Sequence, residues 1–253
     1  MLTMGYANRP RDDKVSDGGD DAWFVTNSVV NAVGVADGVG SWRDQGINAG
    51  ECAREIMDVC KDYFTHAGTS PCAALSEAES YSTKAGSTTA IVAQYHDIGH
   101  LEVCQVGDSN LVVIRDNYVL YQTSSQVRYH NSPYQIGTGA TDTVKTHSKR
   151  YNFSVEKGDI IILGSDGLWD NLYPAQAMQM VKLSGLKSAT SIARLLTSIA
   201  YELSQDKQMW SPFAQDAYED GQMPTPMTSE DKKRWKGGKP GDITVVVAIV
   251  QES

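Results

Sequence analysis

One local pattern recurs along this chain: an apolar, strand-like segment runs into a corner made of aspartate and glycine. It appears in residues 33–38 (Val-Gly-Val-Ala-Asp-Gly), 103–109 (Val-Cys-Gln-Val-Gly-Asp-Ser) and 160–167 (Ile-Ile-Ile-Leu-Gly-Ser-Asp-Gly). Gly241-Asp242 opens the last apolar run in the mirror arrangement, and Asp20-Asp21 precedes another strand-like segment. A strand end fixes a carboxylate, and an adjacent glycine lets a ligand approach the backbone closely. The pattern therefore favours a strand-rich fold that carries carboxylates at strand ends.

These strand-end aspartates have two explanations. If they converge, their charges repel one another unless a cation neutralises them. Hard divalent cations such as Mg²⁺ and Mn²⁺ prefer oxygen ligands, and the chain offers no paired histidines or thiolates of the kind zinc prefers. Two such ions roughly 3.5–4 Å apart can share a bridging hydroxide and clamp a phosphoryl group. Each corner is also an ordinary turn sequence, and spacing alone does not show that the corners converge.

The order of the expected elements favours antiparallel sheets that carry helices. Apolar, strand-like runs are expected at 22–26, 31–36, 88–95, 101–106, 111–115, 118–122, 151–155, 159–163 and 243–250. Helices are expected at 49–64, 71–82, 174–183, 190–205 and 212–220. Residues 1–20, 38–46, 123–150 and 221–241 look irregular. Adjacent strands form hairpins, and no repeat or linker interrupts residues 1–253, so a single domain is expected.

Net charge and cysteine content limit the binding partners and the cellular compartment that the chain is expected to have. The net charge of −9 disfavours nucleic acid and anionic membrane surfaces as partners, because like charges repel. No apolar run approaches the roughly 18–20 residues of a membrane span. The cysteines form no Cys-x-x-Cys pair and no zinc pattern, so free, buried thiols in a reducing, intracellular compartment are expected at Cys52, Cys60, Cys72 and Cys104.

Read together, these motifs resemble those of the metal-dependent Ser/Thr protein phosphatases, the PPM or type 2C family. The resemblance covers residues 18–250 and rests on 20–22 (Asp-Asp-Ala), 35–40 (Val-Ala-Asp-Gly-Val-Gly), 86–90 (Gly-Ser-Thr-Thr-Ala), 106–109 (Val-Gly-Asp-Ser), 165–170 (Ser-Asp-Gly-Leu-Trp-Asp) and 241–245 (Gly-Asp-Ile-Thr-Val). Trp42 and residues 211–214 and 237–242 are similar to a short, eukaryotic, often organellar branch of that family, some members of which are mitochondrial.

The resemblance implies a fold and a metal centre. The fold would be α+β, a four-layer α-β-β-α sandwich of two antiparallel sheets flanked by helices. Two Mg²⁺ or Mn²⁺ ions would lie at one end, with a weaker third ion in some members. By position, the ligands would be Asp37 as the bridge, Gly38 through its carbonyl oxygen, Asp166 and Asp242 on one ion, Asp20 on the second and Asp108 on the third.

The remaining family positions would play supporting or catalytic roles. Asp37, Asp166 and Asp242 would carry catalysis through the metals, and Asp21 would hold the water network. Trp169 and Asp170 would brace the corner that carries Asp166.

Two departures from the family pattern concern catalysis. Many members place a general-acid histidine where this chain has Val39, and a phosphate-binding arginine before the acidic pair, where this chain has Lys-Val-Ser-Asp-Gly-Gly in 14–19. Positioned acid catalysis contributes roughly 10²–10⁴-fold, whereas metal activation of water would remain. The branch shares the valine, so an active enzyme is still expected. Lys14, Arg11 or Arg9 could reach into the site instead, but all three are interpreted as flexible surface charges.

Other polar residues give weaker signals. His66, His96, His100 and His147 are expected at the surface. Arg128 and His130 are weak candidates for contacts near the site. The basic stretch 232–236 is interpreted as a solvated loop, with a flap that meets acidic phosphoproteins as the alternative.

Three functions therefore compete. The first is an active phosphatase, a monomer in the cytoplasm or a mitochondrion, that acts on phosphoproteins. The second is a pseudophosphatase or binding module on the same fold, against which the retained carboxylates argue. The third is an unrelated nucleotide-binding α/β enzyme, which the absence of Gly-x-Gly-x-x-Gly and Gly-Lys-Ser/Thr loops disfavours.

Overall fold

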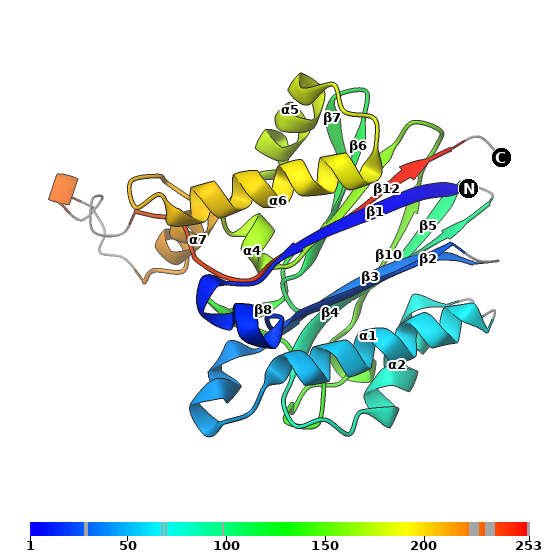
Figure 1. The fold of residues 1–253 in the computed structure, drawn as a ribbon, viewed down its shortest axis with the longest axis horizontal. Coiled ribbons are helices and arrows are strands. Elements are labelled where there is room, and N and C mark those ends of the chain that lie inside the picture. Colours follow the sequence, from blue (N-terminus) through cyan, green and yellow to red (C-terminus); the bar gives the residue numbers. More distant parts are fainter. Residues whose placement is uncertain are drawn as a thin grey trace.

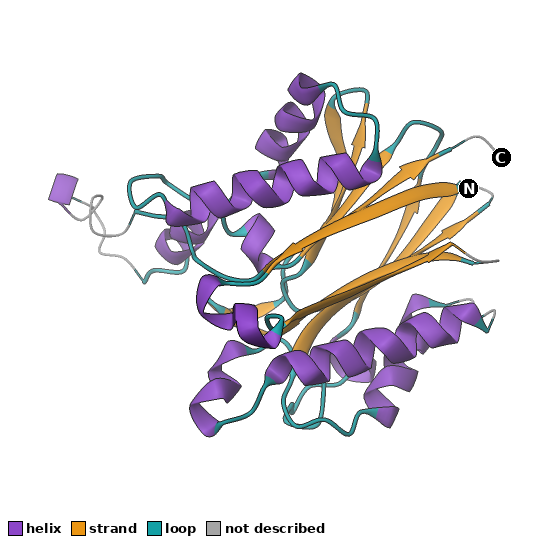
Figure 2. Ribbon diagram, viewed as in Figure 1, coloured by secondary structure: helices purple, strands orange, loops and turns teal. Residues whose placement is uncertain are grey.

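Two antiparallel five-stranded sheets pack face to face in the computed structural model, and helices cover both outer faces (Figures 1 and 2). The structure describes residues 1–27, 30–66, 68, 70–97, 99–222, 228–230 and 236–251. The first sheet has the order β1 (Leu2–Arg9), β12 (Ile243–Val250), β11 (Ile160–Gly164), β6 (Asn110–Arg115), β7 (Tyr118–Gln122). The second has the order β10 (Lys149–Ser154), β5 (His100–Val106), β4 (Thr88–His96), β3 (Asn31–Gly38), β2 (Asp21–Asn27). The predicted four-layer α+β sandwich is confirmed.

Three apolar layers hold the sandwich together. Val35 and Ile91 of one sheet meet Leu163 and Val246 of the other in the central layer. Neighbouring residues on the same strands point outward under the helices, because successive side chains on a strand face opposite sides. The central strands are therefore buried on both faces, as their nearly continuous apolar sequences indicate.

Helices α1 (Ala49–Thr65) and α2 (Pro71–Tyr81) cover the second sheet, and α5 (Pro174–Ser184) and α6 (Ala189–Gln205) cover the first. Ser70 caps α2 with proline in its first turn, and Ser211 does the same for α7 (Pro212–Glu219). Within the described residues, no helix has the length and apolarity needed to cross a membrane.

The amino-terminal segment differs from the expectation of an irregular lead-in. Residues 2–9 form β1, which pairs with β12 along its whole length. Gly5 weakens the strand signal of this segment, but a Cβ there would lie 2.3 Å from the backbone nitrogen of Thr190, so glycine is what lets α6 approach the strand. A short 3₁₀ helix, η1 (Asp12–Asp17), follows and leads to the acidic pair.

Two other segments expected to be irregular also contain short elements. The Gly-rich loop 38–46 holds the 3₁₀ helix η2 (Gly40–Gln45). Residues 123–150 hold β8 (Val127–Tyr129), β9 (Ser132–Pro133) and α3 (Val144–His147). Most of the basic stretch 232–236 lies outside the described residues.

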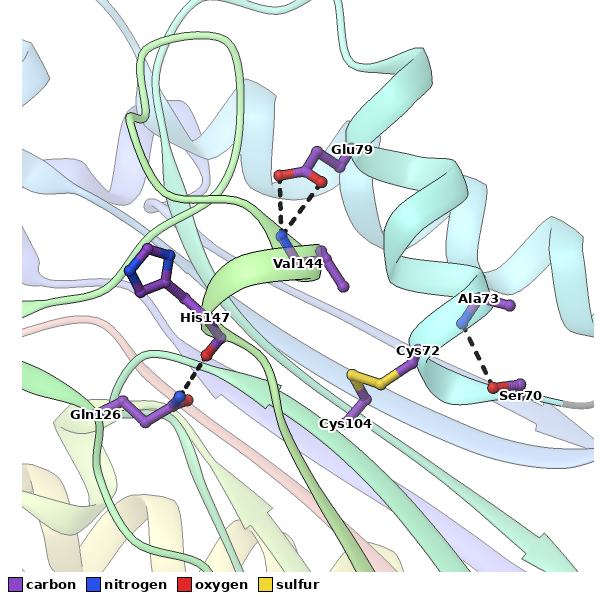
Figure 3. The surroundings of a disulfide bond; sticks show 8 residues. All are labelled: Ser70, Cys72, Ala73, Glu79, Cys104, Gln126, Val144 and His147. Carbon is purple, nitrogen blue, oxygen red and sulfur yellow. Dashed lines mark hydrogen bonds between the residues drawn. A yellow bond between two sulfur atoms is a disulfide. The ribbon is translucent and has the colours of Figure 1, made fainter.

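Two of the four cysteines are not free thiols, which corrects the sequence expectation. Cys72 of α2 and Cys104 of β5 form a disulfide across 32 residues of sequence (Figure 3). Cys52 and Cys60 are free and buried, as expected. The sequence did not predict this pair because the packing of α2 on β5 brings the two cysteines together, and no short Cys-to-Cys spacing in the sequence indicates such a contact. The argument for a reducing compartment therefore loses its basis.

The disulfide gives a stability prediction. Reduction should lower the free energy of unfolding by about 2–4 kcal/mol, because the cross-link restricts the unfolded chain, and Tm should fall by roughly 4–16 °C. The measurement is thermal unfolding with and without reductant, with thiol state checked by mass. The Cys72→Ala/Cys104→Ala variant is the control and should not respond to reductant. An unchanged Tm in fully reduced wild type would contradict the prediction.

Candidate active site

The strand-end aspartates converge at one end of the sandwich, where four of them line one cavity. Asp21 on β2 lies directly across from Asp37 on β3 in the strand register. Asp108 lies in the corner between β5 and β6, Asp166 begins the short helix α4 (Asp166–Trp169) after β11, and Asp242 immediately precedes β12. A cavity of about 350 Å³ is lined by Asp37, Gly38, Asp108, Asp166 and Asp242. The alternative that these corners are unrelated turns is therefore wrong.

Burial and mutual repulsion dominate the electrostatics of this carboxylate group. Burial, with repulsion from Asp166 and Asp21, raises the pKa of Asp37 well above its ordinary value. Burial and Asp166 raise the pKa of Asp108 to about 8, and burial and Asp242 raise that of Asp21 to about 7. Such a group holds protons unless cations replace them, which is the behaviour expected of a site for divalent metal ions.

The donor set fits Mg²⁺ or Mn²⁺. One oxygen of Asp21 accepts a hydrogen bond from Ser165 at 2.8 Å, whereas Oδ1 is buried with no hydrogen-bond partner in the described part of the chain. A buried carboxylate oxygen without a partner is costly, so a cation or a bound water suits this position. A Cβ on Gly38 would lie 2.7–2.8 Å from backbone atoms of Ala49 and Asp20, so only glycine fits there.

Lysine ammonium groups hold several of these carboxylates. No group of three or more His, Cys, Asp or Glu side chains in the described ranges has metal-binding geometry. Lys14 Nζ lies 2.6 Å from Asp20 Oδ2 and 2.8 Å from Asp242 Oδ2. Lys239 Nζ lies 2.6 Å from an oxygen of Asp166. We infer that these pairs draw the carboxylates away from one another, so a metal would have to compete with ammonium groups.

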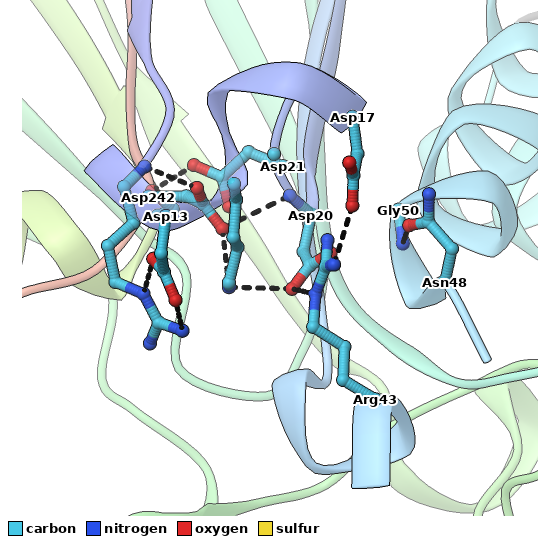
Figure 4. Close-up of polar contacts among 12 residues, drawn as sticks. Asp13, Asp17, Asp20, Asp21, Arg43, Asn48, Gly50 and Asp242 are labelled. Carbon is cyan, nitrogen blue, oxygen red and sulfur yellow. Dashed lines mark hydrogen bonds and ion pairs between the residues drawn. The ribbon is translucent and has the colours of Figure 1, made fainter. Parts of the chain in front are cut away.

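Lys14 is therefore no flexible surface charge, which corrects the expectation from sequence. Its side chain is only 7% exposed and it lines the carboxylate cavity. The backbone N–H of Arg11 donates to Asp242 Oδ1 at 2.7 Å, while its side chain pairs with Asp13 (Figure 4). The Arg9 guanidinium lies over the Tyr201 ring at 3.4 Å. Lys14 and Arg11 both line the cavity, whereas Arg9 does not.

Arg43 is a site residue that sequence reasoning missed. Its Nη2 lies 2.6 Å from Asp20 Oδ1, and its Nη1 lies 2.6 Å from Asp17 (Figure 4). Arg43 and Lys14 lower the pKa of Asp20 against the opposing effect of burial. Its place in η2, soon after the Asp-Gly corner, is the signal that could have suggested it.

The remaining candidates fall into two groups. Val39 lines the cavity, so position 39 faces the place where substrate would bind. Trp169 donates from Nε1 to the backbone oxygen of Asn110 at 3.0 Å, which fits a bracing role. Arg128 pairs with Asp142 and does not line this cavity, and His130 lines a neighbouring cavity of about 380 Å³ beside Asp108.

The repulsion within the carboxylate group gives a pH prediction. A raised folded-state pKa of Asp37 contributes stability that is complete below the unfolded-state pKa and is lost as pH rises. Asp37→Asn removes this titration, so the stability of metal-free Asp37→Asn relative to wild type should rise as the pH increases above the ordinary carboxyl range. Urea unfolding in excess chelator measures it. Exposed Asp58 provides the control, because Asp58→Asn should track wild type; a pH-independent difference for Asp37→Asn would refute the prediction.

Comparison with known proteins places the chain. Residues 31–214 match the family model described as stage II sporulation protein E (SpoIIE). Probable protein phosphatase 2C 80 of Arabidopsis thaliana is 34% identical over 100% of this chain and 59% of its own length. Probable protein phosphatase 2C 26 of Arabidopsis thaliana is 31% identical over 100% of this chain and 85% of its own length. The chain thus spans little more than half the length of some of these relatives.

Solved structures agree with this placement. The X-ray structure of the photosystem II phosphatase PBCP is 30% identical, covers 99% of both chains and has a TM-score of 0.93. The catalytic domain of the serine/threonine protein phosphatase PstP, solved with two manganese ions, is 18% identical with a TM-score of 0.63 over 100% of both chains, which shows a shared fold. The family model matches most of the chain, type 2C relatives align with all of it, and the fold is shared. The chain therefore belongs to the metal-dependent type 2C (PPM) family of protein serine/threonine phosphatases.

Proposed function

We propose that this chain hydrolyses phosphoserine and phosphothreonine esters in proteins with two Mg²⁺ or Mn²⁺ ions. The observation that carries the proposal is the single cavity lined by four strand-end aspartates and Gly38 in a chain of the type 2C family. Bound divalent ions would supply an activated water and neutralise phosphate charge. The proposed ligands are Asp20, Asp37, Gly38, Asp166 and Asp242.

The protein's part in this reaction is to position and neutralise charge. Asp37 and Asp21 are fixed relative to each other because they face each other across paired strands. Ser165, which is buried, holds Oδ2 of Asp21, and Oδ1 has no hydrogen-bond partner among the described residues. Arg43 anchors Asp20 from the outer side through a two-point contact. These supports would hold the ligands in place as cations and substrate arrive.

Lys14 is proposed as the phosphate-binding cation in place of the family's arginine. It is buried beside the cavity between Asp20 and Asp242, both of which are proposed metal ligands. Divalent ions on those carboxylates would free the ammonium group, which would then lie next to the substrate phosphate. Val39 offers no proton to a leaving group, so water would have to supply that proton, and the metal ions would neutralise the developing charge.

The proposed substrates are phosphoproteins, and the whole of residues 1–253 is proposed as one catalytic domain that acts as a monomer. The similarity to the photosystem II phosphatase PBCP supports an organellar setting more than the cytoplasm. The net charge of −9 argues against nucleic acid and anionic membrane surfaces as partners. A pseudophosphatase is not proposed, because no observation favours loss of catalysis.

Metal dependence tests the proposed function directly. Hydrolysis of a phosphothreonine peptide should require added Mn²⁺ or Mg²⁺ and stop in excess chelator, because the aspartates have no other route to activate water. Phosphate release at matched protein concentration is the measurement. Full activity in chelator would remove the metal assignment, and metal binding without turnover would favour the pseudophosphatase.

Matched aspartate variants serve as controls for that assay. Asp37→Asn and Asp242→Asn should lower kcat by roughly 10³-fold or more, because each removes charge stabilisation at the reacting phosphate. Asp13→Asn should keep near wild-type rates, since Asp13 is an exposed carboxylate paired with Arg11.

Lys14 gives a separate kinetic prediction. Lys14→Ala should lower kcat/KM for phosphopeptide by roughly 10- to 100-fold, which corresponds to the loss of one charged hydrogen bond. Lys14→Arg should recover part of the loss, since it restores the positive charge. Arg9→Ala is the matched control and should leave kcat/KM unchanged, because Arg9 stacks on Tyr201 away from the cavity. Unchanged kcat/KM in Lys14→Ala would show that Lys14 does not bind the substrate phosphate.

A further inference from the structure

Lys239 is the most completely bonded cation in the described part of the site. Its Nζ lies 2.6 Å from Asp166 Oδ2, 2.6 Å from Asp170 Oδ2 and 2.9 Å from Asn131 Oδ1. It also lies 4.9 Å from the centroid of the Phe213 ring. A lysine ammonium group has three N–H donors, so these three oxygens use all of them. The group therefore has the full set of partners of a bound cation.

The backbone of Lys239 is held as firmly as its side chain. Its N–H donates to Asn171 Oδ1 at 2.8 Å, and its carbonyl oxygen accepts from Asn171 Nδ2 at 3.0 Å. Asn171 is fully buried, and its Nδ2 also donates to the carbonyl oxygen of Gly167 at 2.9 Å. One amide side chain thus ties the Lys239 segment to the α4 corner that carries Asp166 and Asp170. The position of the ammonium group is built into the fold.

Asp108 belongs to the same set of charges. Burial and the negative charge of Asp166 raise the pKa of Asp108, whereas the positive charge of Lys239 opposes that rise. Asp108 and Asp166 also line one cavity with Lys239. Asp166 and Asp170 therefore contact the ammonium group, and Asp108 shares the cavity that Lys239 lines. A further divalent ion bound here would lie a few ångströms from that ammonium and be repelled by it.

Lys14 and Lys239 differ in how they would respond to bound metal. Both carboxylates that hold Lys14 belong to proposed metal ligands, so Lys14 has to give way when the ions bind. Lys239 keeps Asp170 and Asn131, neither of which is a proposed ligand. Asp166 can offer its other oxygen to a metal while Lys239 stays where it is.

We propose that Lys239 is the resident cation of the Asp108–Asp166–Asp170 side of the site, and that it excludes a third divalent ion there. The inference rests on the proposed two-ion phosphatase function and specifies the metal content of that same site. The third position implied by family resemblance is thereby occupied by an amino acid of the chain itself. Replacement of the ammonium group by a neutral side chain should convert the three carboxylates into a metal site.

Counting bound Mn²⁺ tests the proposal without relying on activity. Equilibrium dialysis and titration calorimetry at saturating Mn²⁺ should give two ions for wild type and for Lys239→Arg. They should give three for Lys239→Met, which keeps an apolar chain against Phe213 but removes the charge. Adding Asp170→Asn to Lys239→Met should return the count to two, because one carboxylate of the new site is lost. Circular dichroism checks that each variant is folded.

The possible counts separate failure of this inference from failure of the proposed function. Three ions in wild type, with the third lost in Asp108→Asn, would overturn the inference. The proposed phosphatase function would not be affected by that result. A count of two in folded Lys239→Met would also overturn it. No bound Mn²⁺ and no phosphopeptide hydrolysis by wild type would overturn both. A wild-type count of three overturns the inference even where Lys239→Met does not fold.

Discussion

Mutual repulsion among buried aspartates is the constraint on which the rest of this structure depends. Asp21, Asp37, Asp108 and Asp166 lie close enough at one end of the sandwich that burial and like charge raise the pKa of three of them. Folding the chain without metal therefore needs compensation from elsewhere. Two lysines supply part of it, and each bridges a pair of aspartates. The site is a high-energy feature held by a stable frame.

The two packed sheets resist this repulsion because their central strands are buried on both faces. The register of β2 against β3 places Asp21 opposite Asp37, and a shift of one residue would turn both side chains to other faces. The three apolar layers keep that register, since a slip would expose their side chains. Packing far from the site thus determines the spacing of charges within it, and the site's chemistry depends on that spacing.

Sequence patterns predicted the elements whose signals are local. The expected apolar strands and helices are confirmed. Asp116 and Asn117, between β6 and β7, both have the positive φ that a tight hairpin requires. Strand β1 was missed because its polar residues and Gly5 are weak strand formers, so pairing with β12 decides its conformation. The disulfide was missed for a related reason, because the packing of α2 on β5 brings its two cysteines together.

The sequence by itself determined the antiparallel strands with their helices and the set of acidic residues at strand ends, because apolar periodicity and Asp-Gly corners are properties of neighbouring residues. The resemblance of its motifs to a known family indicated the sandwich. Tertiary structure alone decided which cations meet those aspartates. Lys14 reaches Asp242 across 228 residues, and Lys239 reaches Asp166 across 73. A long, flexible side chain carries no local signal of its partner, so its role is decided only when folding brings a buried carboxylate within reach and removes the water that would otherwise solvate both charges.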